Sequence, residues 1–359
     1  VLFGTFAGDV ADHVWRRPAI RVTQSLALLQ ALVLAALTWT GYIEIWHLIT
    51  LALFLGFVQA LDIPLRQSLW VHLVEDRADL PNAIALNSFL VNTARVVGPA
   101  LAGVLLGLVS EAVCFALNAL SFVAVIVAIG RMHWANEPPP APWQGGFWKS
   151  WVEGYHFVSG FAPARALLLL VGVLAWTVSP YSSLMPAYAK DVLGGGPQTL
   201  GLLLSAAGAG ALVSTLYLAR RPTVRGLFRV IPIARLTCGL ALPGFAYLAY
   251  APLAALLMIF VGGGVILAAA SVSTILQTIV ADRLRGRVAG FYSLAFIGMA
   301  PLGSIAAGAL ANRVGIPAAF AADGLAAAAA ALIFWRALPT LRHHMRPTYV
   351  KLGIISSDT

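Results

Sequence analysis

Charged side chains inside apolar segments are the groups of this chain best placed to do chemistry. Arg95 lies near the middle of one long apolar segment, and Asp323 lies within the last one. Ionised groups are costly inside a hydrocarbon layer, and they usually face a cavity in which they bind charged substrates or carry protons. Arg95 is therefore a candidate contact for an anionic group of a substrate, and Asp323 is a candidate proton carrier.

Simpler interpretations stay open for these groups. Arg95 can instead tie its helix to a carboxylate or to a helix end of a neighbouring segment. Asp62 is a second candidate for proton coupling, but it stands four residues before Arg66 at the end of a segment. Side chains at this spacing are neighbours on a helix, so a local ion pair is the simpler interpretation.

Three common catalytic or phosphate-binding patterns are absent from the sequence. It contains no Gly-x-Ser-x-Gly nucleophile elbow, no His-Glu-x-x-His and no phosphate-binding Gly-x-x-x-x-Gly-Lys. Cys114 and Cys238 each lie inside an apolar run, where a cysteine is usually a small buried hydrophobe. We expect no enzymatic activity, no metal site and no cofactor.

The composition indicates a membrane protein. Of the 359 residues, 60% are hydrophobic and only 10% are charged, and the mean hydropathy is +0.86. Soluble proteins carry about 25% charged residues, and a soluble fold of this composition would expose large apolar patches. The net charge of +9 fits either nucleic-acid binding or basic residues gathered on one side of a membrane.

Ten apolar segments are long enough to cross a bilayer, which takes about 20 helical residues. Their continuous apolar character favours helices over the alternating strands of a membrane barrel. Val1–Ala7 has the character of the end of a further segment, so we expect that this chain lacks a first helix and most of a second. The ten segments lie at 19–39, 46–73, 82–108, 112–130, 164–188, 199–219, 230–250, 253–280, 287–311 and 316–338.

Basic residues gather in alternate connections between these segments. The only basic residues in the opposite connections are Lys190 and Arg313. Because basic residues mark the cytoplasmic side, we expect an inner-membrane protein with both ends of this chain in the cytoplasm, and no nucleic-acid binding. The basic side carries Arg16, Arg17, Arg21, Arg66, Arg77, Arg131, Lys149, Arg165, Arg220, Arg221, Arg225, Arg229, Arg283, Arg285, Arg287, Arg336, Arg342, Arg346 and Lys351.

The longest connection separates two halves that echo each other. Val74–Arg77 is matched by Val280–Arg283, and each quartet ends a long helix at a tight turn. Between the halves, apolar residues recur at helical spacing from Phe147 to Val158, which predicts an amphipathic helix at the membrane surface. Internal repeats of this kind build many secondary transporters. The chain divides into a first bundle at 1–131, a linker at 132–163, a second bundle at 164–338 and a cytoplasmic tail at 339–359.

Two motifs resemble those of the major facilitator superfamily. Gly8-x-x-x-Asp12-x-x-x-Arg16-Arg17 resembles the loop between the second and third helices, although Trp15 stands where that loop usually has glycine. The run from Arg95 to Gly103, which contains Gly98 and Pro99, resembles the Gly-Pro bend motif in the fifth helix of superfamily exporters. More specifically, Gln59–Gln67 and Asp282–Arg287 resemble the enterobactin-exporter-like and macrolide-efflux-like branch.

The resemblance covers essentially the whole chain and implies an all-α fold of two six-helix bundles, here without its first helices. It also implies a cytoplasmic gate, in which Asp12 accepts hydrogen bonds from the helix start at Gly286 and Arg287. Arg16 or Arg17 would orient the carboxylate, and Asp282 belongs to the matching turn of the second half. A solvated loop that only obeys the charge distribution is the alternative.

The same resemblance places a substrate cavity between the first, fourth, seventh and tenth helices. An aromatic and methionine-bearing lining suits bulky amphipathic compounds, although each position taken alone is more often a packing residue. Asn92, one turn before Arg95, lies near the same stripe. The candidate lining residues are Gln59, Asn92, Arg95, Trp176, Tyr181, Met185, Ser271 and Gln277.

These expectations combine into a secondary transporter that works by alternating access. We expect a monomer that exports siderophore-like or drug-like molecules in exchange for protons. An uptake permease of the same fold is one alternative, and a non-transporting membrane scaffold or receptor is another. A cavity with buried polar groups would favour transport, whereas a dry and well-packed centre would favour a scaffold.

Overall fold

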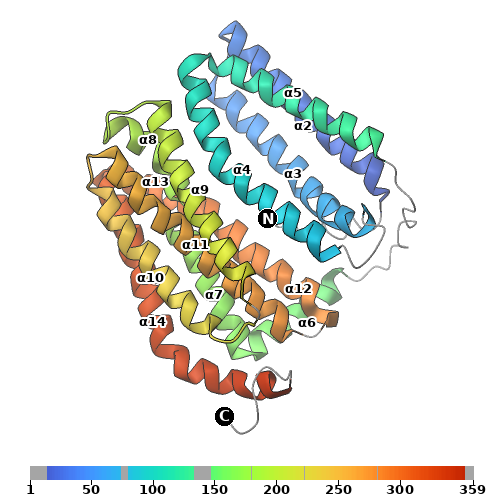
Figure 1. Ribbon diagram of the computed structural model, residues 1–359, viewed down its shortest axis with the longest axis vertical. Coiled ribbons are helices and arrows are strands. Elements are labelled where there is room, and N and C mark those ends of the chain that lie inside the picture. Colours follow the sequence, from blue (N-terminus) through green and yellow to red (C-terminus); the bar gives the residue numbers. More distant parts are fainter. Residues whose placement is uncertain are drawn as a thin grey trace. The chain divides into compact units, whose positions relative to one another are not determined.

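The computed structural model describes residues 14–73, 80–132, 147–178, 180–221, 223–280 and 282–351. Within these ranges the chain forms helices and no strand, as the continuous apolar runs predict (Figure 1). The chain splits into two compact units. Unit 1 comprises residues 1–91 and 104–147, and unit 2 comprises residues 92–103 and 148–359.

Unit 1 is built around α2, which packs against α3 and α5. Its small core contains Ile20, Leu65 and Ile129. Many of its other large apolar side chains are exposed, among them Trp39 and Leu53, as expected where lipid tails cover the protein. The helices of unit 1 are α2 (Arg16–Thr40), α3 (Ile45–Leu73), α5 (Glu111–Arg131) and parts of α4 (Leu80–Leu108), which continues through unit 2.

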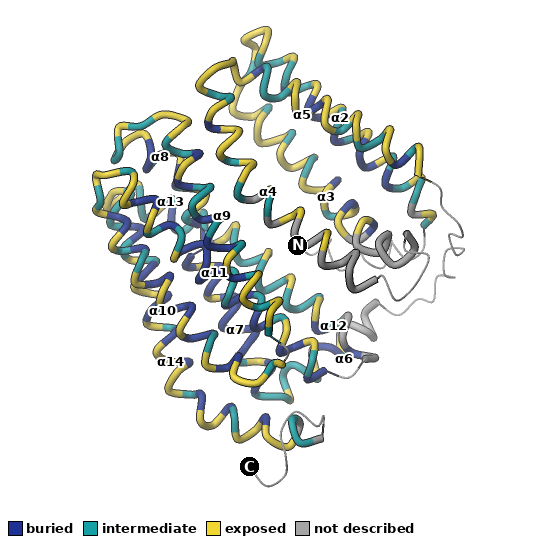
Figure 2. Tube along the Cα trace, in the orientation of Figure 1, coloured by how far each residue is buried: buried dark blue, intermediate teal, exposed yellow. Residues whose placement is uncertain are grey.

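Unit 2 holds the larger core, which forms two clusters of buried residues. Figure 2 shows buried residues along α7 and α11, the two helices at its centre. Its helices are α6 (Phe147–Gly160), α7 (Ala162–Thr177), α8 (Tyr181–Asp191), α9 (Pro197–Ala219), α10 (Leu227–Ala246), α11 (Ala251–Ile279), α12 (Asp282–Ser293), the π-helix η2 (Leu294–Gly298), α13 (Met299–Val314) and α14 (Ile316–Lys351).

Small residues let the helices of unit 2 approach closely. A Cβ added to Gly210 of α9 would stand 2.8 Å from the backbone nitrogen of Gly263 on α11. A Cβ added to Gly262 would stand 2.7 Å from the Cα of Ala207. Close backbone approach of this kind lets membrane helices associate through van der Waals contact alone.

Nine helical stretches in the described part of the chain are long and apolar enough to cross a membrane, and Val96–Leu108 of α4 is a shorter apolar stretch. The ten expected segments therefore correspond to helices, but two of them are interrupted. The segment at 164–188 breaks between α7 and α8, where Pro180 precedes the second helix. The segment at 287–311 contains the π-helix η2.

The last helix is longer than the sequence analysis predicted. We expected it to end at residue 338, whereas α14 continues to Lys351. Leu338, Leu341 and Met345 recur at helical spacing and are all buried in the second cluster of unit 2. This apolar stripe keeps the chain helical beyond the length that a bilayer needs.

Candidate functional site

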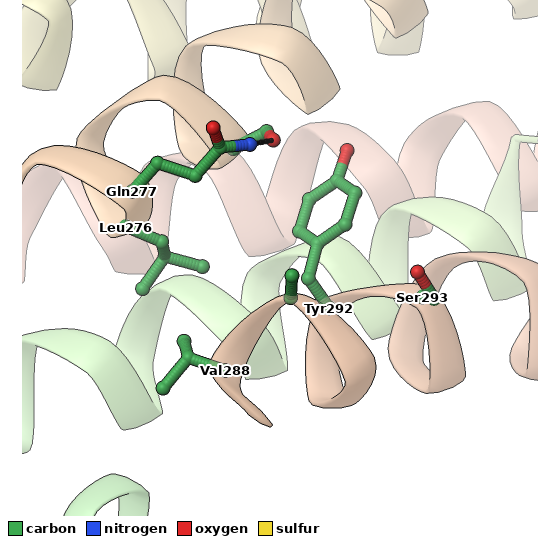
Figure 3. A pocket seen from close by; sticks show the side chains of 7 residues that line it. Leu276, Gln277, Val288, Tyr292 and Ser293 are labelled. Carbon is green, nitrogen blue, oxygen red and sulfur yellow. Dashed lines mark hydrogen bonds between the residues drawn. The ribbon is translucent and has the colours of Figure 1, made fainter. Parts of the chain in front are cut away.

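A cavity of about 210 Å³ lies between α11 and α12 in unit 2. In Figure 3, Gln277 extends from α11 in the direction of Tyr292 on α12. The cavity is amphipathic, because hydroxyl and amide groups share it with aliphatic side chains. Its lining consists of Ser273, Leu276, Gln277, Val288, Ala289, Tyr292 and Ser293.

Hydrogen bonds position the two largest polar side chains of this cavity. The Gln277 amide nitrogen donates to the Ser273 hydroxyl at 3.0 Å, one turn earlier on α11. The Tyr292 hydroxyl donates to the Ala269 carbonyl at 2.9 Å and so ties the end of α12 to α11. The π-helix η2 begins two residues after Tyr292, and such turns are frequent at functional sites.

Among the predicted cavity residues whose side chains the structure describes, Gln277 alone lines this cavity. Ser271 and Met185 are fully buried, and Met185 belongs to the first cluster of unit 2. Trp176 and Gln59 are exposed and Tyr181 is half-buried, on three other helical elements. The predictions for the side chains of Asn92 and Arg95 lie outside the described residues.

Ser273, Tyr292 and Ser293 line the cavity but are not among the residues predicted from the sequence. Ser273 could have been found, because it stands four residues before Gln277 and therefore on the same face of α11. Tyr292 and Ser293 could not, because only the packing of α12 against α11 brings them to the cavity.

Asp62 lies in a fully hydrogen-bonded environment. Its Oδ2 pairs with Arg66 at 2.8 Å, so the expected local ion pair is present. Its Oδ1 accepts from the Thr23 hydroxyl at 2.7 Å and from the Gln24 amide at 2.8 Å. The residue is 4% exposed and ties α3 to α2. These contacts describe a structural anchor.

Asp323, unlike Asp62, has a carboxylate oxygen without a hydrogen-bond donor among the described residues. Its Oδ2 is buried and makes no hydrogen bond with any described residue. Arg235 on the packed helix α10 is fully buried and donates to the carbonyls of Leu170 and Ala327. Tyr188 of α8 likewise donates to the carbonyl of Phe245.

Arg235 was also missed by the sequence analysis. It stands within the expected segment at 230–250, and a basic residue inside an apolar run was the signal that had singled out Arg95. Its two carbonyl bonds join α10 to α7 and α14, so it stabilises the centre of unit 2.

The described part of the gating motif includes two arginines. Arg17 donates to the carbonyl of Gly130 at 3.0 Å and thereby joins α2 to the end of α5. Arg287 of α12 forms an ion pair with Glu153 of α6. Gly8 and Asp12, and the predictions for Arg16, Asp282 and Gly286, lie outside the described residues or rest on side chains that are not described.

The predicted bend motif contains one crowded and one open glycine. A Cβ added to Gly103 would stand 2.7 Å from the Pro197 carbonyl oxygen and 2.9 Å from the Cα of Gly201. A Cβ added to Gly98 would meet nothing within 4 Å. Pro99 lies inside α4, which continues through it. Within unit 2, Gly103 therefore allows α4 to touch α9 backbone to backbone.

The linker helix α6 forms where the amphipathic pattern predicts it, and part of its apolar surface packs on protein. Phe157, Val158 and Phe161 lie against the second cluster of unit 2, together with Phe291 of α12. Gly154 of α6 is so close to Phe291 that an added Cβ would stand 2.9 Å from its ring. The linker helix is therefore docked on α12.

Comparison with known proteins identifies relatives among transporters. The model of a family described as transmembrane secretion effector, within the major facilitator superfamily, matches residues 1–349. The staphyloferrin A transporter of Staphylococcus aureus is 24% identical over 93% of this chain and 83% of its own length. The multidrug efflux pump Tap of Mycolicibacterium fortuitum is 27% identical over 89% and 79%.

Solved structures agree on the fold. The crystal structure of the peptide transporter POT in complex with alafosfalin has a TM-score of 0.73 and covers 95% of this chain and 84% of its own. A POT family transporter in complex with 5-aminolevulinic acid has a TM-score of 0.70 and covers 94% and 85%. Their identities of 14% and 12% extend the likeness to the fold alone.

Proposed function

Because this chain belongs to the transmembrane secretion effector family of major facilitator transporters, we propose that it exports amphipathic small molecules in exchange for protons. It is a multi-pass membrane protein and a secondary transporter, and its relatives include a siderophore transporter and a multidrug efflux pump. The proposed substrates are siderophore-like or drug-like compounds. The protein moves them across the membrane without altering them chemically. A single copy of the protein is the proposed transport unit.

The observation that carries this proposal is the amphipathic cavity between α11 and α12. Gln277, Ser273 and Tyr292 offer hydrogen-bonding groups, while Leu276 and Val288 offer apolar contact. Ligand sites generally combine an apolar lining with a few polar groups that fix orientation. A volume of about 210 Å³ holds one part of a drug-sized molecule, so this cavity is the proposed subsite for an amphipathic end of the substrate.

Proton coupling is assigned to Asp323 in this proposal. Asp62 could exchange a proton only by giving up bonds from Thr23, Gln24 and Arg66. Asp323 has a buried oxygen without a donor among the described residues, so it can gain and lose a proton without breaking such a network. The exchange follows if substrate and proton favour different conformations of the same protein.

The arginine-rich ends of the helices are the proposed cytoplasmic side, in line with the positive-inside rule. The proposed gate lies there, at the start of α12. Arg287 already pairs with Glu153 of the docked linker helix, and the family motif adds Asp12 as a second proposed carboxylate. Opening toward the cytoplasm then requires α12 to leave one or both of these partners.

Export from cells that express the full-length protein tests the proposal. A panel of siderophores and antibiotics is loaded, and efflux is followed with and without a protonophore, against cells with an empty vector. We expect efflux of at least one amphipathic compound, which stops when the proton gradient collapses. Faster accumulation instead of efflux would indicate an uptake permease, and no change for any compound would indicate a scaffold.

A further inference from the structure

One end of unit 2 carries a dense group of basic residues without acidic neighbours in the sequence. They come from the connection between α9 and α10 and from the last part of α14. The stretches 192–281 and 324–351 contain no Asp or Glu. We call the following residues the arginine face: Arg220, Arg225, Arg229, Arg336 and Arg342.

Hydrogen bonds stabilise the described part of the connection between α9 and α10. Arg221 donates to the Tyr217 hydroxyl at 2.8 Å and to the Arg225 carbonyl at 2.8 Å. Gly226 then turns the chain with a φ of 87°, a left-handed conformation that favours glycine. Arg221 is thus used within the loop, and Arg220, Arg225 and Arg229 remain exposed around it.

The end of α14 brings its arginines to the same place. Gly239 of α10 meets Gly324 and Ala328 of α14, and Gly324 meets Pro243. These contacts show that α10 and α14 run antiparallel. When the same pairing is extended toward the start of α10, Arg229 lies opposite the part of α14 that follows Trp335. Phe228 and Leu341 belong to the same cluster of buried residues, and each stands one position before an arginine of this face.

The guanidinium groups of Arg229 and Arg342 carry like charges that no acidic side chain in these two stretches offsets. The charge of Arg229 lies close enough to act on Arg342, and neither residue forms an ion pair or side-chain hydrogen bond within the described part of the chain. Like charges near a low-dielectric surface repel one another, and an anion placed between them removes that cost. The chain supplies no carboxylate for this purpose in either stretch.

The arginine face also lies at the depth of lipid headgroups. About 20 helical residues cross the hydrocarbon layer, and α14 reaches Trp335 and Arg336 after that length, counted from Ile316. Trp335 is 45% exposed and Tyr217 is 45% exposed. Exposed Trp and Tyr side chains mark the boundary between hydrocarbon and headgroups.

We propose that the arginine face binds the phosphate of an anionic phospholipid headgroup, with Arg229 and Arg342 on either side of it. Arginine suits this role because its planar guanidinium donates two parallel hydrogen bonds to phosphate oxygens. The acyl chains lie along the apolar outer surface of α10 and α14, where Ile233, Leu240 and Leu332 are exposed. The bound lipid joins the α9–α10 connection to the end of α14. This inference does not depend on transport.

Lipid titration of the purified chain in detergent, followed by native mass spectrometry, tests this inference. The probes are phosphatidylglycerol and phosphatidylcholine, which differ in net charge. We expect tighter binding of phosphatidylglycerol. The double variant Arg229→Gln/Arg342→Gln should weaken it about 25-fold, because each basic residue near an anionic membrane contributes about fivefold.

The matched control is the double variant Lys190→Gln/Arg313→Gln. It also removes two exposed positive charges, but these lie in the last turns of α8 and α13 and not on the arginine face. It should bind phosphatidylglycerol within twofold of the unchanged chain. Arg229→Lys/Arg342→Lys keeps the charge but not the planar pair of donors, so its affinity should lie between those of the unchanged chain and the glutamine variant. This intermediate affinity distinguishes a lost contact from a folding defect. Equal losses in both glutamine variants, or equal binding of the two lipids, would overturn the inference. Displacement of the lipid by excess inorganic phosphate would also overturn it, in favour of a free-anion site.

Discussion

At the scale of single residues, two carboxylates inside apolar helices differ in what surrounds them. Asp62 accepts from three side chains, and breaking these bonds would leave the buried Gln24 amide without its partner. Asp323 has a buried oxygen without a donor in the described part of the molecule. The same residue type therefore serves as an anchor in one unit and as the proposed proton carrier in the other.

Neutralising these two residues should produce opposite defects. Asp62→Asn should lower thermal stability, on the order of 2 kcal/mol, because it removes a charge that holds three donors. Asp323→Asn should leave the melting temperature nearly unchanged and abolish the dependence of export on the proton gradient. Thermal unfolding in detergent and export with a protonophore measure the two effects. An Asp323→Asn variant that stays proton-coupled would contradict the assignment.

Gln277 provides the test of the cavity. Gln277→Ala removes an amide that can orient the polar end of a substrate, and a lost hydrogen bond of this kind costs about 1 kcal/mol. We expect the KM for export to rise about fivefold at equal expression. Gln198→Ala, which changes an exposed glutamine at the start of α9, is the control. Equal KM values for the two variants would remove the cavity from the substrate path.

At the scale of helices, one docking contact lies at the proposed gate. The linker helix α6 is held on α12 by the ion pair from Glu153 to Arg287 and by the packing of Gly154 against Phe291. The amphipathic pattern of α6 could be predicted from spacing alone. Its docking on protein could not, because an apolar stripe does not specify whether lipid or another helix covers it.

Glu153→Gln should loosen this docking. Without the carboxylate, Arg287 loses its charged partner on α6, while the apolar contacts of Phe157 and Phe161 remain. We expect hydrogen exchange over residues 147–160 to speed up severalfold, with no change in α10. Glu111→Gln changes an exposed carboxylate at the start of α5 and should leave exchange in α6 as it was. Identical exchange in both variants would show that the ion pair between Glu153 and Arg287 does not hold α6 on α12.

The glycines of the bend motif offer a second test at this scale. Gly103→Ala adds a methyl group 2.7 Å from the Pro197 carbonyl oxygen and should separate α4 from α9, at a cost of about 1–3 kcal/mol. Gly98→Ala adds the same methyl group to open space. We expect loss of transport and lower thermal stability for the first variant only. Equal behaviour of both would show that the close contact has no role.

At the scale of the whole molecule, much of the fold could be predicted because of the bilayer. Each crossing segment must satisfy its own backbone hydrogen bonds as a helix, and each needs about 20 apolar residues to span the hydrocarbon layer. The breaks could be predicted only in part, because a proline does not by itself decide whether a helix is interrupted. Pro180 marks the gap between α7 and α8, yet Pro232 and Pro243 lie inside an unbroken α10. The site was harder still, since Met185 and Ser271 share the sequence character of lining residues but are buried in packing.

Proton exchange by the reconstituted protein tests the central claim most directly. Full-length protein in proteoliposomes, with a pH-sensitive dye inside, is given a gradient of one exported compound and no imposed pH difference. We predict that substrate movement in one direction drives protons in the other, and that Asp323→Asn stops the proton signal. Substrate movement without any proton signal, or with protons in the same direction, would contradict the account.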